Sequence, residues 1–159
     1  MRAALVVLLL LTGVAHADLH ASKVGKVTVD IPKKWSVNAT DELVRAASPD
    51  NAVAFVMWVV ESADAKEGLK KLEHELYSSI QGLKWFDKVK KLKVNKLDAS
   101  WIEGAGVNAS AAQLDVLVVV AGPTSTKKGV IMLAVVEHTK LVANRKPIET
   151  IFKSLKPTK

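Results

Sequence analysis

A lysine-rich segment that also holds two adjacent aromatic residues is the part of this sequence best suited to bind a partner. Between positions 84 and 96 it carries six lysines within thirteen residues. Ammonium groups attract anionic surfaces, and aromatic rings beside them add apolar contact area. We therefore predict that this segment contacts an anionic envelope component or an acidic protein. The predicted partner-binding residues are Lys84, Trp85, Phe86, Lys88, Lys90, Lys91, Lys93 and Lys96.

A second interpretation of the same segment stays open. Lysines on the outermost strand of a sheet also prevent edge-to-edge aggregation, and Trp85 and Phe86 can cap the hydrophobic core. Under this interpretation the segment protects the fold and binds no partner.

Residues able to ligate a metal or to catalyse a reaction are scattered along the chain. Glu73, His74 and Glu75 are adjacent, but successive helical residues point about 100° apart and cannot converge on one ion. No serine stands in a Gly-x-Ser-x-Gly setting, and the chain has no cysteine nucleophile. We predict a non-enzymatic protein with no metal site and no cofactor; an uncharacterised enzyme is the third functional hypothesis.

Three tryptophans raise a second hypothesis. Trp35, Trp58 and Trp101 fall in predicted strands, where we expect them to belong to the core. If two of them lined one concave face, a small apolar ligand could bind there. The alternative function is therefore a carrier of a small apolar ligand between sheet and helix.

These residues have to be positioned by strands and helices that the sequence pattern predicts. After a polar lead at 18–23, alternating polar and apolar residues predict strands at 26–31, 35–37 and 43–47. The apolar run 52–60 predicts a central strand covered on both faces. Leu69, Leu72, Leu76 and Ile80 recur at helical spacing and predict an amphipathic helix over 65–80, ended by Gly82 and lying on a sheet.

The second half of the chain is predicted to consist mainly of strands, at 89–97, 101–108, 114–121 and 130–137. Gly104 and Gly106 indicate a bulge or a close backbone approach in one of them. Pro147 is the expected first residue of a C-terminal helix that ends before Pro157. The predicted fold class is α+β: an antiparallel sheet of about six to seven strands, with one amphipathic helix between the strand-rich halves and one C-terminal helix packed on it.

The N-terminus has the features of a cleavable secretory signal. Arg2 precedes an aliphatic run, and Ala15-His16-Ala17 supplies small residues where a signal peptidase reads. The run is shorter than the roughly 18 residues that span a membrane. We predict a signal peptide at 1–17 and a single domain at 18–159, with no transmembrane segment in the mature chain. We expect a soluble periplasmic or secreted protein that, lacking cysteine, is neither a lipoprotein nor disulfide-bonded.

The charge of the chain favours anionic partners. Its 23 lysines and arginines against 16 aspartates and glutamates give a formal net charge of +7, and loss of Arg2 with the signal leaves +6. Such a surface attracts anions without selecting among them. Together with export, it favours an envelope component or an acidic protein and argues against nucleic acid as the partner.

The order of elements and a few local motifs resemble the PsbP-like superfamily, which takes in the photosystem II extrinsic protein P, a Ran-binding nuclear import factor and many exported bacterial proteins. The motifs are the strand that runs into Ile31-Pro32-Lys33-Lys34-Trp35, the strand-to-helix crossing at 60–69, the hairpin sequence at 94–121 and the closing helix at 148–155. The resemblance covers most of the mature chain. It implies the fold of that superfamily and a binding, accessory or assembly role, with no catalytic residues to transfer.

Overall fold

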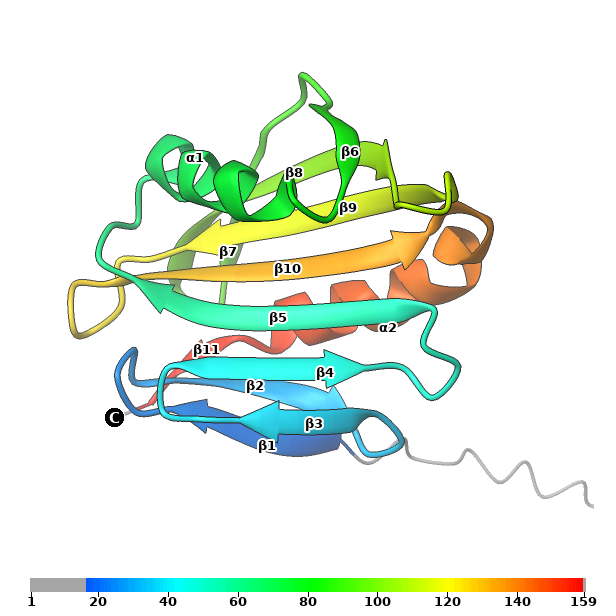
Figure 1. Cartoon of the computed structure of the whole chain (residues 1–159). Coiled ribbons are helices and arrows are strands. Elements are labelled where there is room, and N and C mark those ends of the chain that lie inside the picture. The colour runs from blue at the N-terminus through cyan, green and yellow to red at the C-terminus, as the bar shows by residue number, and fades with distance from the viewer. Residues whose placement is uncertain (1–16, 159) are drawn as a thin grey trace, which may run out of the picture.

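The structure is a computed structural model that describes residues 17–158 (Figure 1). Of the predicted signal peptide, residues 1–16 lie outside the described part. The described part begins with β1 (Ala17–Ser22) and β2 (Val27–Pro32), which pair antiparallel with each other; β11 (Lys156–Pro157) pairs with β2. These form a small sheet in the order β1-β2-β11. The predicted polar lead at 18–23 is therefore wrong, because Asp18 to Ser22 pair with β2.

A larger antiparallel sheet of eight strands forms the centre of the molecule. Its order is β3-β4-β5-β10-β9-β8-β6, with β7 also paired to β8. The α+β class is confirmed, but the expected six to seven strands are too few, and the second sheet was not predicted. The strands are β3 (Ser36–Ala39), β4 (Leu43–Ala47), β5 (Val53–Val60), β6 (Gln81–Trp85), β7 (Lys90–Val94), β8 (Leu97–Val107), β9 (Gln113–Ala121) and β10 (Gly129–Glu137).

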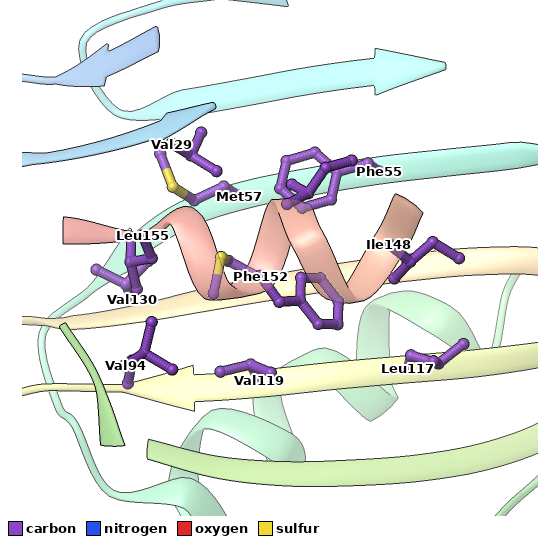
Figure 2. Close-up of a cluster of buried hydrophobic side chains, with 14 of the residues drawn as sticks. Val29, Phe55, Met57, Val94, Leu117, Val119, Val130, Ile148, Phe152 and Leu155 are labelled. Atoms are coloured by element: carbon purple, nitrogen blue, oxygen red, sulfur yellow. The ribbon is translucent and has the colours of Figure 1, made fainter. Parts of the chain in front are cut away.

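Helix α2 (Leu141–Ser154) and the small sheet cover one face of the large sheet. Figure 2 shows Ile148, Phe152 and Leu155 of this segment among side chains of the large sheet. The Phe152 ring lies 6.1 Å from that of Phe55 and 5.2 Å, edge on, from that of Trp101. Packing of this kind, rather than helix propensity, holds a short helix in place. The predicted C-terminal helix on the sheet is confirmed.

Pro147 is not the first residue of α2, contrary to the prediction from the sequence. The helix starts at Leu141, directly after the 3-10 helix η1 (His138–Lys140), and Pro147 lies inside it. A proline there leaves the carbonyl of Ala143 without its helical hydrogen bond. Ala143 is exposed, so water can hydrate that carbonyl, while the buried residues beyond Pro147 keep the helix on the sheet.

Helix α1 (Ala65–Leu76) covers the opposite face of the large sheet (Figure 1). Leu72 and Leu76 pack with Val118 of β9 and Ile131 of β10, which confirms an amphipathic helix lying on a sheet. The Asp64 carboxylate accepts a hydrogen bond from the amide of Glu67 and caps the first turn. The helix ends at Leu76 and not at residue 80.

The chain after α1 differs from the prediction because a turn at 77–80 leads from the helix into a strand. Gly82, the predicted terminator, lies in β6 with a positive φ of 61°. Farther on, the predicted strand at 89–97 is a hairpin: β7 turns into β8 through Asn95 and Lys96, both with positive φ. Two such residues match the tight turn that joins twisted antiparallel strands.

The apolar strand β5 is central, but only one of its faces is fully covered. Val53, Phe55 and Met57 are buried on the α2 side, whereas Ala54 is exposed and Trp58 is half-buried on the α1 side. The expected cover on both faces is therefore wrong in part, because the short α1 packs mainly on β8, β9 and β10. No helix in the described part of the chain is long and apolar enough to cross a membrane.

Candidate partner-binding edge

Strands β6 and β7 lie in line along the same side of β8 and form one outer strand with a break. Trp85 pairs with Gly104 and Lys90 with Trp101, both on β8. The amide of Phe86 still donates to the carbonyl of Glu103 at 2.8 Å, and residues 87–89 then leave the ladder. We call residues 81–94 the interrupted edge. No further strand pairs with its outer side within residues 17–158.

All six predicted lysines are exposed on or beside this edge. Lys93 forms an ion pair of 2.9 Å with Asp98, and both side chains are about three-quarters exposed. The ammonium of Lys91 donates to the Ser100 hydroxyl at 2.8 Å. The other four form no ion pair in the described structure, although the charge of Lys90 also acts on Glu103 and helps to lower its pKa. They are Lys84 on β6, Lys88 in the break, Lys90 on β7 and Lys96 in the hairpin turn.

The two aromatic residues of the segment occupy different environments. Trp85 is half-buried against the core beneath α1, and its indole N–H donates to the Glu73 carboxylate. This ring packs on the core, as the second interpretation expected of it, and holds the end of β6 beside the break. Phe86 is 50% exposed, and Val89 close by is 49% exposed. Apolar surface therefore accompanies the lysines at the break.

The hairpin turn fixes the other end of the edge. The side-chain amide of Asn95 donates to the carbonyls of Lys153 and Leu155, each at 2.9 Å. Carbonyls at a helix C-terminus lack hydrogen-bond donors within the helix, and the Asn95 amide supplies a donor to two of them. These two hydrogen bonds hold the turn of the β7–β8 hairpin against the end of α2.

Between the interrupted edge and α2 the surface is hollowed. A cavity of about 410 Å³ is lined by Phe86, Asp87, Lys88, Lys90, Glu103 and Arg145. A neighbouring one of about 300 Å³ shares Lys90 and Arg145 and continues to Leu92, Trp101 and Lys153. We call the two together the α2 groove. Lys90 lies at the point where the groove and the edge meet.

Arg145 and Glu103 both line the larger cavity of the α2 groove, and neither was predicted from the sequence. The guanidinium donates to Glu103 Oε1 at 2.5 Å, and the Trp101 indole donates to the same oxygen at 2.7 Å. Burial alone raises the pKa of Glu103, but the hydrogen bonds from Arg145 and Trp101 outweigh burial and hold this pKa below its ordinary value. The hydrogen bond to Glu103 likewise raises the pKa of Arg145.

The sequence indicates a local partner for each of Glu103 and Arg145, but it does not indicate that the two residues pair with each other. Trp101 and Glu103 are two residues apart on one strand and share a face, and Arg145 and Glu149 are four apart on a helix and also pair. Either spacing indicates a local pair. Neither tells which strand the helix covers.

The histidines of residues 17–158 lie on separate elements. His138 pairs through Nδ1 with the buried Asp115 carboxylate at 2.8 Å, and no serine or threonine hydroxyl hydrogen-bonds to it in the described structure. His20 lies on β1 and His74 on α1, far apart in the topology. Residues 17–158 hold no cluster of three or more histidine, aspartate or glutamate side chains able to bind a metal.

Gly104 and Gly106 have the structural role that their spacing indicated. A Cβ at Gly106 would lie 2.4 Å from Ile80 and 2.9 Å from the Gln81 carbonyl. A Cβ at Gly104 would lie 2.7 Å from the Trp85 ring. The β6–β8 pairing also shifts register between Gln81 and Lys84. The predicted close backbone approach is confirmed, and it seats β6 against β8.

The tryptophans are divided between the two faces of the sheet. Trp101 is buried in the core beneath α2, with Trp35 packed against the margin of that core, whereas Trp58 packs with the core beneath α1. Trp35 lies in the bend before β3 and not in a strand. Trp58 borders an open cavity of about 450 Å³ beside α1, together with Leu43, Val56, Leu72 and Leu76.

Comparison with known proteins identifies the fold. No protein-family model and no curated protein sequence matches the chain. Among solved structures, cyanobacterial PsbP (CyanoP) from Synechocystis sp. PCC 6803 has a TM-score of 0.67 at 8% identity, with 92% of this chain and 95% of that chain covered. LpqN of Mycobacterium tuberculosis, described as involved in cell envelope biogenesis, has a TM-score of 0.58 at 13% identity, with 84% and 83% covered.

Two further structures extend the likeness. The Ran-binding protein Mog1p of Saccharomyces cerevisiae has a TM-score of 0.57 at 11% identity, with 87% of this chain and 94% of that chain covered. A protein from Bacteroides thetaiotaomicron has a TM-score of 0.63 at 11% identity; the match covers 91% of this chain but spans only about half, 49%, of that one. The chain therefore has the PsbP-like fold shared with Mog1p.

Proposed function

We propose that this protein is an exported, non-enzymatic binding or accessory protein that meets an anionic partner at the interrupted edge. The observation that carries the proposal is the set of exposed lysines without ion pairs along one free sheet edge. LpqN, involved in cell envelope biogenesis, and the Ran-binding Mog1p support by analogy a role in assembly or binding.

Charge and apolar surface at the edge act at different ranges. Exposed charges attract a partner over about 8 Å at physiological salt. Once the partner is near, Phe86 and Val89 offer apolar area that water leaves on contact. An anionic partner with some apolar surface therefore fits the edge better than a purely polar polyanion.

Export is part of this proposal and rests on the sequence of residues 1–17. Cleavage after Ala17 would leave Asp18, on β1, as the first residue of the mature chain. Intact-mass measurement of the protein recovered from the medium or the periplasm tests this. A mass that retains residues 1–17 would exclude cleavage.

The binding proposal is tested with two variants of equal net charge. In the first, Lys88, Lys90, Lys91 and Lys93 are changed to Gln. In the control, Lys34, Lys70, Lys140 and Lys146 are changed to Gln; these are exposed on other elements and form no ion pair within residues 17–158. Binding to anionic vesicles and to envelope proteins is measured at low and physiological salt.

We expect the edge variant to lose binding and the control variant to keep most of it. Added salt should weaken wild-type binding, because salt screens exposed charges. Equal binding by both variants would show that net charge alone is responsible and would refute the role of the edge.

The cavity beside α1 favours one alternative function, a carrier of a small apolar ligand. It lies between helix and sheet. Trp58, Val56 and Leu133 give it apolar walls, and Glu42, Arg45 and Glu75 also line it. Its volume of about 450 Å³ is within the usual range for small-molecule sites.

Native mass spectrometry of protein purified from its own host tests the carrier function. A bound ligand should disappear in Val56→Asp, which places a charge in the cavity wall. Ala54→Asp changes the same face of β5 at an exposed position outside the lining and should keep the ligand. A ligand-free spectrum of the wild-type protein would contradict this alternative.

A further inference from the structure

The backbone of the interrupted edge has unpaired hydrogen-bonding groups at defined residues. Phe86 donates to Glu103 of β8, which shows that odd-numbered β8 residues direct their backbone groups toward the edge. Pairing along β8 is continuous from 99 to 107 with β9 and from 97 to 101 with β7, so this alternation persists. Lys90 and Leu92, opposite Trp101 and Ala99, therefore bond inward.

The backbone groups of the alternate residues of β7 point away from β8. Lys91 and Lys93 direct one N–H and one C=O each away from the sheet. No strand of the described chain accepts them. Such a row of backbone groups is the usual template for adding a strand from another chain.

Side chains of β7 place positive charge on both faces of the sheet. Lys91 lies opposite Ser100 and projects to the α1 side together with Lys93. Lys90 and Leu92 project to the α2 side, where they line the α2 groove. A flat anionic membrane could contact only one of these faces at a time. A strand added in the plane of the sheet would meet both.

We infer that the anionic partner is an extended acidic polypeptide segment that pairs with β7 as an additional strand of the large sheet. This inference rests on the proposed function. Carboxylates at alternate positions of the segment would face Lys91 and Lys93, because side chains directly opposite on neighbouring strands lie about 5 Å apart. On the α2 side, the side chain opposite Leu92 is expected to be apolar, and the segment also meets the charge of Lys90 there.

The same lysines disfavour a second copy of the chain as the occupant. Two β7 strands paired with each other would bring lysines together across the pair, and like charges directly opposite are destabilising. Protection against self-pairing and selection of an acidic strand are therefore one property of this edge.

The free edge at the other end of the large sheet supplies a matched control. The backbone N–H of Thr40 donates to the carbonyl of Leu43 at 2.7 Å, so Thr40 bonds inward, toward the neighbouring strand. The N–H of the preceding residue, Ala39 on β3, therefore points outward by the same alternation. Proline is tolerated on an edge strand where its missing N–H faces solvent. Lys91→Pro and Ala39→Pro thus remove one outward N–H from each edge.

The probe is a short synthetic peptide of alternating glutamate and valine, its affinity measured by calorimetry or fluorescence anisotropy. Lys91→Gln removes the charge and keeps the N–H, so the comparison with Lys91→Pro isolates the backbone bond. We expect Lys91→Pro to bind about three- to tenfold more weakly than Lys91→Gln. Ala39→Pro should bind like the wild type. Circular dichroism checks that each variant is folded.

Peptide chemistry provides a test that needs no variant protein. Methylation of alternate backbone nitrogens blocks pairing only when the methylated set faces β7. One of the two methylated peptides should lose binding to the wild-type protein, and the other should keep it.

The outcomes separate the inference from the proposed function. If the four-lysine edge variant loses binding while both methylated peptides bind like the parent, the lysines bind an anion but strand pairing is overturned. If anionic vesicles bind and the peptide does not, a membrane is the partner and the inference is overturned. If the edge variant keeps full binding to every probe, the proposed function itself fails.

Discussion

Arg145 on α2 and Glu103 on β8 are joined across the helix–sheet interface by a hydrogen-bonded ion pair, 42 residues apart in sequence. The Glu103 side chain is 22% exposed and the Arg145 side chain 37% exposed. Because the same carboxylate oxygen also accepts the Trp101 indole N–H, the pair sets the position of α2 relative to the strand next to the interrupted edge. The α2 groove takes its shape from this contact.

Replacing Arg145 with Ala should lower the free energy of unfolding by about 1–3 kcal/mol, because a partly buried carboxylate is left with the indole N–H as its remaining donor. Adding Glu103→Gln to this variant should recover part of the loss, since the amide oxygen still accepts from Trp101. Urea unfolding of the two single variants and the double variant measures the coupling. Strictly additive losses would show that the pair contributes nothing.

Acid should weaken the fold through Glu103. Its pKa in the folded protein lies below the ordinary value of 4.5, so folding favours the ionised form. The stabilisation is present above the unfolded pKa and is lost as pH falls through the folded pKa. We expect the free energy of unfolding to fall less steeply below about pH 4.5 in Glu103→Gln than in the wild type. Parallel pH profiles would contradict this.

Gly106→Ala should destabilise the protein by about 1–3 kcal/mol, because the new methyl group would overlap Ile80 and crowd the Gln81 carbonyl. Gly82→Asn is the matched control on the facing strand. Nothing lies within 4 Å of a Cβ at Gly82, and asparagine tolerates its positive φ. Thermal unfolding should separate the two; a normal melting temperature for Gly106→Ala would disprove the close approach.

Phe152→Ala should cost about 3–5 kcal/mol of unfolding free energy, since this fully buried ring contacts Phe55 and Trp101 at the centre of the core. Val142→Ala lies on the same helix but is 91% exposed and should change stability little. Chemical denaturation of both variants gives the comparison. A cost below about 1 kcal/mol for Phe152→Ala would mean that α2 is not the main cover of this face.

Strands with several core residues were predicted close to their observed bounds, whereas the edge strands β3 and β7 were predicted only approximately and β1 and β6 were missed. The predicted bounds 43–47 are those of β4, whose Val44 and Ala46 face inward. By contrast, β6 and β1 each have a single buried residue, Leu83 and Ser22, so the pairing of β6 with β8 and of β1 with β2 determines them more than burial does. The start of α2 was missed for a similar reason, because its residues before Ile148 are not buried.

The candidate site was predictable in composition but not in geometry. Clustered lysines at 84–96 identified the segment, because charge density is a local property. Which backbone groups remain free depends on the break at 87–89 and on the register with β8. The contribution of Arg145 depends on where α2 docks, and no local pattern encodes that.

The Asn95 amide that completes the end of α2 has a consequence for how the interrupted edge would bind. Trp85 is held through Glu73 at the end of β6, and Asn95 is held through α2 just beyond β7, so the strands on both sides of the break are anchored before any partner arrives. The loss of conformational entropy on binding then falls almost wholly on the incoming segment. A stiff, already extended partner would therefore bind more tightly than a flexible one of the same sequence, and the affinity would be set by the partner's own disorder.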